Sequence, residues 1–76
     1  MQHYKNYLIY TSAIHTANGT WCGIGRVLDP QAKLVREIRR VETATDLVFL
    51  TNQEAEEFAL KLCKAWIDKS VLYKTM

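Results

Sequence analysis

A chain of 76 residues is large enough for one small domain, and its formal net charge of +2 is too low to require an anionic partner. Hydrophobic residues make up 49% of the sequence and charged residues 24%, a balance that excludes an intrinsically disordered protein. We therefore expect residues 1–76 to form a single domain with a small core, for which oligomerisation is one route to stability.

The first predicted element is a β-hairpin over residues 7–28. Asn18-Gly19 favours a two-residue type I′ turn, because both residues tolerate positive φ. Counting outward from that turn pairs Ile14 with Gly23. Gly23 and Gly25 share one face of the strand, where the missing side chains leave room for a packed helix or, alternatively, for a ligand or partner strand.

Residues 29–42 fit two different structures. Asp29-Pro30 suits a helix start, with Asp at the N-cap and Pro at the first helical position. The same dipeptide is also good turn chemistry leading into a strand over residues 33–42. Three strands with a hydrophobic face are the usual minimum for an independently stable sheet, so we favour the strand.

Thr51-Asn52-Gln53-Glu54 marks the start of the next element, because a Thr at the N-cap and a Glu three residues later form a capping box. An apolar face with helical spacing follows, made of Ala55, Phe58, Ala59, Leu62 and Trp66. We expect an amphipathic helix over residues 52–69 and a short tail over 70–76. The predicted fold is α+β: a three-stranded antiparallel sheet in the order β-β-β-α, with the C-terminal helix packed on one face.

Catalytic and metal-binding patterns are sparse. In the expected hairpin His15 faces Cys22, which would suit a cysteine–histidine pair, but no orienting group accompanies it. His15, Cys22 and Cys63 lack the spacing of a structural zinc site, and two lone cysteines do not make a disulfide framework. We predict no cofactor and no enzyme activity, and we interpret both cysteines as buried thiols in a reducing compartment.

Five basic residues lie in or near the second and third expected strands: Arg26, Lys33, Arg36, Arg39 and Arg40. Such residues on a sheet can contact the phosphates and bases of DNA. Glu37 and Glu42 interrupt this set, so a solvated outer face is the interpretation that we favour.

Four further apolar residues lie off the main helical stripe or in the tail: Leu60, Ile67, Leu72 and Tyr73. They would either extend the core or form the seam of a homodimer. The sequence leaves both interpretations open.

Targeting signals are not visible in the sequence. The apolar run near the N-terminus is short and interrupted, unlike the apolar region of a signal peptide. No run approaches the roughly 20 apolar residues of a membrane span. We expect a cytoplasmic protein that does not bind membranes.

The run Phe49-Leu50-Thr51-Asn52-Gln53-Glu54-Ala55-Glu56 resembles the helix entry of arm-type DNA-binding domains at the N-termini of tyrosine recombinases. Those domains are similar to AP2-like modules, and the resemblance implies three strands packed on one helix, with the sheet in the major groove. The chain also resembles small stand-alone bacterial proteins of unassigned role, whose helix ends in a run like Ala65-Trp66-Ile67-Asp68. That second resemblance implies a fold and no activity.

These observations lead to one preferred function and two alternatives. We expect a non-enzymatic protein–protein interaction module of a bacterial-type cytoplasmic protein, with a partner that the sequence does not identify. A nucleic-acid-binding domain is the alternative, and a small enzyme is the third hypothesis.

Overall fold

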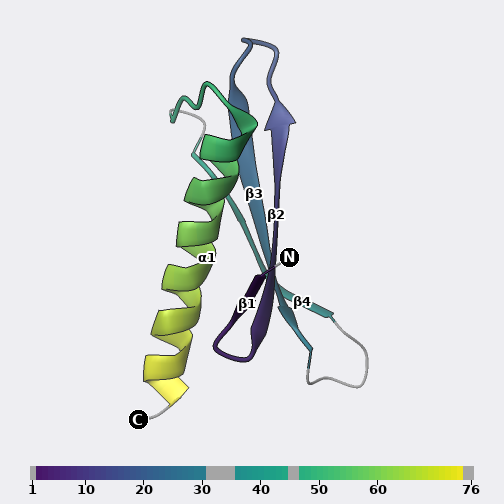
Figure 1. The fold of residues 1–76 in the computed structure, drawn as a ribbon. Coiled ribbons are helices and arrows are strands. Elements are labelled where there is room, and N and C mark those ends of the chain that lie inside the picture. Colours follow the sequence, from purple (N-terminus) through teal and green to yellow (C-terminus); the bar gives the residue numbers. More distant parts are fainter. Residues whose placement is uncertain (1, 31–35, 45–46, 75–76) are drawn as a thin grey trace.

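The computed structural model describes residues 2–30, 36–44 and 47–74 and forms two layers, an antiparallel sheet and a helix that crosses one of its faces (Figure 1). The strands lie side by side in sequence order. The elements are β1 (Gln2–Tyr4), β2 (Tyr7–His15), β3 (Trp21–Asp29), β4 (Arg36–Glu42) and α1 (Asn52–Lys74). The α+β class, the antiparallel sheet and the C-terminal helix are confirmed, whereas the expected three strands are four.

The additional strand, β1, pairs with the start of β2 through a tight turn. Lys5 and Asn6 form this turn with φ of 47° and 69°, and Tyr4 lies opposite Tyr7. Positive φ at both central residues is the conformation of a type I′ hairpin. A three-residue strand is too short to show alternation, so the apolar pattern gave no sign of it.

The turn between β2 and β3 differs from the expected one. The N–H of Thr16 donates to the carbonyl of Thr20 at 2.8 Å, and the N–H of Gly19 donates to the carbonyl of Thr16 at 3.1 Å. The loop therefore has three residues and ends in Gly19 at φ 77°, as in hairpins that carry a glycine bulge. The expected register was wrong by one residue, because Ile14 pairs with Cys22 and not with Gly23.

Residues 36–42 form the edge strand β4, so the strand interpretation is confirmed there and the helix interpretation is wrong. The expected start of this strand, residues 33–35, lies outside the described residues. A bulge shifts the register between Val27 and Leu28, which pair with Arg39 and Glu37. Ile38 is the extra residue at this bulge and packs against the core.

Helix α1 begins at the expected cap and runs further than expected. The backbone N–H of Glu54 donates to the hydroxyl oxygen of Thr51 at 3.2 Å, and that hydroxyl donates to the Glu54 carboxylate at 3.2 Å. The helix ends at Lys74, so most of the expected tail is helical. In the described part of the chain, no helix is long and apolar enough to cross a membrane.

The helix approaches β3 unusually closely at two glycines. A methyl group on Gly23 would collide with the backbone carbonyl of Ala55, and one on Gly25 would collide with the Sγ atom of Cys63. Packing of a helix against the glycines, the first of the two expected explanations, is therefore confirmed. Four helix residues at four-residue intervals have no exposed surface: Ala55, Ala59 and Cys63 beside the glycines, and Ile67 in the cluster with Ile9 and Val27.

The expected helix face was thus partly wrong. Ala55 and Ala59 are buried as expected, but Phe58, Leu62 and Trp66 are only half-buried at the sides of the contact. The physical reason is the close approach itself, because only small side chains fit between a helix and a glycine-bearing strand. Ile9 and Val27 complete the fully buried core from the sheet, with exposed fractions of 1% and 0%.

A polar cluster fastens the β1–β2 turn to the helix. The Tyr4 hydroxyl donates to Asp68 at 2.8 Å, and the Lys5 ammonium contacts the same carboxylate at 2.6 Å. The Lys64 ammonium lies 5.4 Å from the centre of the Tyr4 ring. Lys64 and Asp68 therefore lie on the side of α1 that faces β1 and β2, with Leu60 one turn before Lys64.

Candidate functional site

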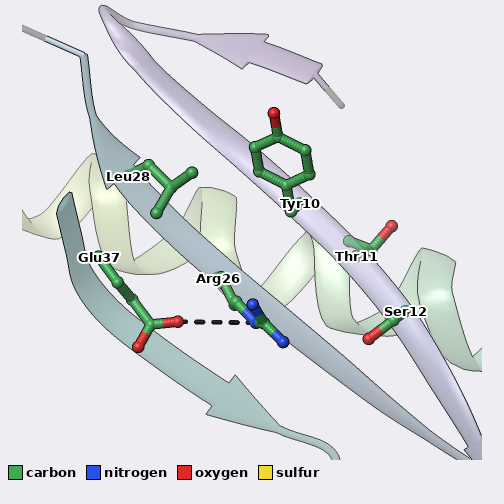
Figure 2. Close-up of a pocket in the computed structure, with 6 residues that line it drawn as sticks. All are labelled: Tyr10, Thr11, Ser12, Arg26, Leu28 and Glu37. Carbon is green, nitrogen blue, oxygen red and sulfur yellow. Dashed lines mark ion pairs between the residues drawn. The ribbon is translucent and has the colours of Figure 1, made fainter. Parts of the chain in front are cut away.

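The face of the sheet opposite α1 carries no covering element among the described residues. Figure 2 shows the side chains of Tyr10, Arg26 and Leu28 in front of the sheet, with the helix behind it. A shallow depression of about 580 Å³ lies on this open face, lined by Tyr10, Thr11, Ser12, Arg26, Leu28 and Glu37. Both aromatic and polar groups are thus presented to the outside.

Charges on the open face neutralise one another. Arg26 lies opposite Arg40 in the β3–β4 ladder. The Nε atom of Arg26 lies 3.7 Å from the Glu37 carboxylate (Figure 2), and Arg40 lies 3.4 Å from Glu42. Because each arginine has a carboxylate neighbour, this face offers little net positive potential to a polyanion.

The remaining candidate nucleic-acid residues lie elsewhere. The guanidinium of Arg39 lies over the Trp66 ring on the helix side of the sheet, 5.9 Å from the ring centre. Arg36 lies opposite Asp29 at the end of the ladder, and Lys33 falls outside the described residues. The described arginines therefore do not gather on one face of the sheet.

A groove runs between α1 and β4. The helix packs mainly over β2 and β3 and touches β4 at few positions, so the space beside β4 stays open. The groove has a volume of about 420 Å³ and is lined by Arg39, Arg40, Val41, Glu42, Leu62, Ala65, Trp66 and Lys69. Three of its apolar residues are half-buried: Val41, Leu62 and Trp66.

The charges of this groove are not balanced. Among the described residues that line it, Glu42 is the one acidic residue, and it contacts Arg40. Within the described part of the chain, neither Arg39 nor Lys69 has a carboxylate partner. The groove therefore joins apolar surface to two cationic groups that remain available to an anion.

The outer edge of β2 is a third candidate surface. β1 covers only its first residues, pairing Gln2 with Ile9 and Tyr4 with Tyr7. From Tyr10 to His15 no described strand lies on that side. This stretch contains neither a charged residue nor a proline, the usual devices that keep strand edges apart.

The four residues expected to form the seam of a homodimer do not form one exposed surface in the structure. Ile67 has no exposed surface and belongs to the core, which removes it from any surface seam. Leu60 is half-buried and packs against the core. Leu72 and Tyr73 lie in the last turn of α1, and their side chains fall outside the described part of the chain.

The expected cysteine–histidine pair does not form. The one-residue change of register places His15 opposite Trp21, with ring centres 4.7 Å apart, and leaves Cys22 opposite Ile14. Cys63 is buried as expected, and burial raises the pKa of its thiol, whereas Cys22 is only half-buried. Cys22 accepts a hydrogen bond from the Thr43 hydroxyl at 3.4 Å. The described residues include no group of three or more metal-ligating side chains.

Sequence reasoning missed the groove and the free edge. Leu62 and Trp66 were assigned to the core because they share the apolar stripe of the helix. No pattern in the sequence indicated that Lys69 would lie beside them in a groove. An uncharged run from Tyr10 to His15 was the one signal that could have identified the edge. No protein-family model, curated protein or solved structure matches this chain.

Proposed function

We propose that this protein is a non-enzymatic interaction module that binds an acidic, amphipathic segment of a partner protein in the groove between α1 and β4. One observation carries the proposal. The groove combines half-buried Leu62 and Trp66 with Arg39 and Lys69, two cations that have no carboxylate partner among the described residues.

The side chains of the groove suit protein recognition. Tryptophan and arginine are enriched among the residues that dominate binding energy at protein interfaces. Here Arg39 lies over the ring of Trp66, so one pocket presents both an apolar plane and a cation. Apolar residues of a partner would pack on Leu62 and Trp66, while its carboxylates accept charge-assisted hydrogen bonds from Arg39 and Lys69.

The same charges argue against duplex nucleic acid as the main ligand. Sequence-independent DNA affinity grows with the number of phosphates that a protein neutralises. The groove supplies two cations without a carboxylate partner in the described ranges, and the arginines of the open face lie beside glutamates. Such a surface supports recognition of a few carboxylates better than recognition of a phosphate backbone.

A peptide-display selection against the purified protein tests this proposal. We expect the selected peptides to be enriched in Asp or Glu at positions that flank large apolar residues. In two-dimensional NMR, synthetic copies of these peptides should shift the signals of Val41, Leu62 and Trp66. Reversing one charge, Lys69→Glu, should weaken their binding about tenfold or more, because a favourable charge contact becomes a repulsive one.

Lys61→Glu is the matched control, since it makes the same charge change two turns earlier on α1, in a separate depression lined by Glu57 and Phe58. It should leave peptide affinity nearly unchanged. Equal weakening by both variants, peptides without acidic enrichment, or signals that shift on the open face instead of the groove would each refute the proposed site. Preferential binding of a mixed-sequence DNA duplex, with a steep dependence on salt, would favour the nucleic-acid alternative.

A further inference from the structure

The segment that leads into α1 exposes large apolar side chains. Val48 and Leu50 have exposed fractions of 65% and 75%, the highest among the large hydrophobic residues of the described chain. We propose that residues 47–57, which comprise this segment and the first turns of α1, bind in the groove between α1 and β4 of a second copy of this chain. The contact rests on the proposed function of the groove and gives that groove a specific partner.

Carboxylates accompany the apolar residues of this segment. Phe49 packs on Phe58 with ring centres 5.4 Å apart, and both line a small depression together with Glu54 and Glu57. Lys61 lines the same depression, but no ion pair between described residues involves either glutamate. Residues 47–57 are therefore both apolar and acidic, which is the chemistry that suits the groove.

The groove presents the opposite charge beside apolar surface of its own. Arg39 and Lys69 have no carboxylate partner in the described ranges, and the half-buried ring of Trp66 lies beneath the Arg39 guanidinium. Leu50 of one copy would pack on Trp66 of the other, while Glu57 accepts charge-assisted hydrogen bonds from the cations. Charge complementarity of this kind selects one partner surface over uncharged ones.

The segment cannot reach the groove of its own chain. Phe49 is held beside Trp21 by a β-bridge, at the end of the molecule that carries the β2–β3 hairpin (Figure 1). Because α1 is one continuous helix that rises 1.5 Å per residue, Leu62 and Lys69 lie roughly 16 and 27 Å along its axis from Thr51. Only the segment of another copy can therefore occupy the groove.

The two contacting surfaces belong to different parts of the chain, so the contact between copies is heterologous. Each bound pair keeps one unoccupied segment and one unoccupied groove, to which further copies add until the ends meet in a ring. A variant with a damaged segment still has an intact groove, and a variant with a damaged groove still has an intact segment. This separation makes the contact testable by mixing two variants.

Sedimentation velocity of the full chain over a range of concentrations is the first measurement. The average mass of the natural chain should rise reversibly with concentration. Leu50→Lys should raise the dissociation constant about tenfold or more, because it removes an apolar contact and brings a third cation to Arg39 and Lys69. Ile14→Lys is the matched control, since Ile14 is also apolar and 54% exposed but lies on the open face of the sheet. The control should associate like the natural chain.

Mixing two weakened variants is the second measurement. Leu50→Lys keeps the groove and Lys69→Glu keeps the segment, so each should associate poorly alone, whereas an equimolar mixture should form a one-to-one complex. A natural chain that stays monomeric at every concentration would overturn the contact. So would a mixture that associates no better than its components, or an equal loss in Ile14→Lys.

Binding of the selected acidic peptides separates this contact from the function on which it rests. A chain that stays monomeric and still binds those peptides in its groove would overturn the self-association alone. A groove that binds no acidic peptide, at a protein concentration where the chain is monomeric, would remove the proposed function and this contact together.

Discussion

The two faces of the sheet are made by alternate residues of the same strands, yet they differ sharply in how they are covered. On the helix side of β2, Ile9 is 1% exposed, whereas Ile14 on the open side is 54% exposed. Both are isoleucines in one strand, so residue type does not decide their burial. Within the described part of the chain a single helix covers one face only, so for these two residues strand alternation decides between a structural and a surface role.

The largest expected effect concerns the covered face. Gly23→Ala should lower the free energy of unfolding by about 3 kcal/mol, the upper end for overpacked sites, because its methyl group would meet the backbone carbonyl of Ala55. Gly19→Ala is the control, since Gly19 has open space around it and a φ of 77°. It should cost about 1 kcal/mol through backbone strain alone. Urea titrations that give equal losses for the two variants would contradict the close approach of α1.

The next prediction compares the two isoleucines of β2 directly. Ile9→Ala should lower the free energy of unfolding by about 2–5 kcal/mol, because it opens a cavity in the core. Ile14→Ala should change it by less than about 0.5 kcal/mol, as is usual for surface positions. Chemical denaturation at low protein concentration is the appropriate measurement, because association would add its own stabilisation. Similar losses at both positions would mean that the open face is covered in solution.

The smallest expected effect lies at the polar cluster beside the helix. Hydrogen bonds from Lys5 and then from Tyr4 lower the pKa of the Asp68 carboxyl below its ordinary value of 3.8. A carboxyl with a lowered pKa in the folded state stabilises the fold above its ordinary pKa and loses that contribution as the pH falls through the folded-state value. The natural chain should therefore be slightly more stable than Asp68→Asn at pH 7.

This advantage should shrink as the pH falls below about 4. Thermal unfolding midpoints between pH 7 and pH 2 measure it. Lys5→Met is the companion variant, and it should also weaken the pH dependence because it removes one donor to Asp68. A difference between the natural chain and Asp68→Asn that stays constant over this range would contradict a stabilising role for the ionised Asp68 carboxylate.

Local signals predicted the type of each long element. The cap at Thr51 and the change to helical spacing identified α1, and the hydrogen bond between Thr51 and Glu54 lies where the capping pattern put it. The minimum size of a stable sheet correctly favoured a strand over residues 36–42. Such features depend on residues that are close together in the chain, so one sequence contains the information needed to predict them.

Details that depend on distant neighbours could not be predicted. Asn18-Gly19 fits a two-residue turn and equally the end of a three-residue loop, and the choice changes every cross-strand partner by one. Likewise, the helical stripe through Leu62 and Trp66 is apolar, but the glycines of β3 select the smaller residues beside it for the closest contact. The groove follows from that selection, so it was not visible in the sequence either.

The close approach of α1 to β3 also determines where the bulky side chains of this small protein can go. Because Gly23 and Gly25 leave room only for Ala55, Ala59 and Cys63 between the layers, three large side chains of the helix lie along the margins of the interface: Phe58, Leu62 and Trp66. Each of these side chains is partly packed against the core and partly exposed to solvent. It therefore contributes both to the stability of the fold and to the surface that a binding partner would contact. Stability and recognition in this chain therefore draw on the same side chains, and a substitution that trims Trp66 would weaken both at once.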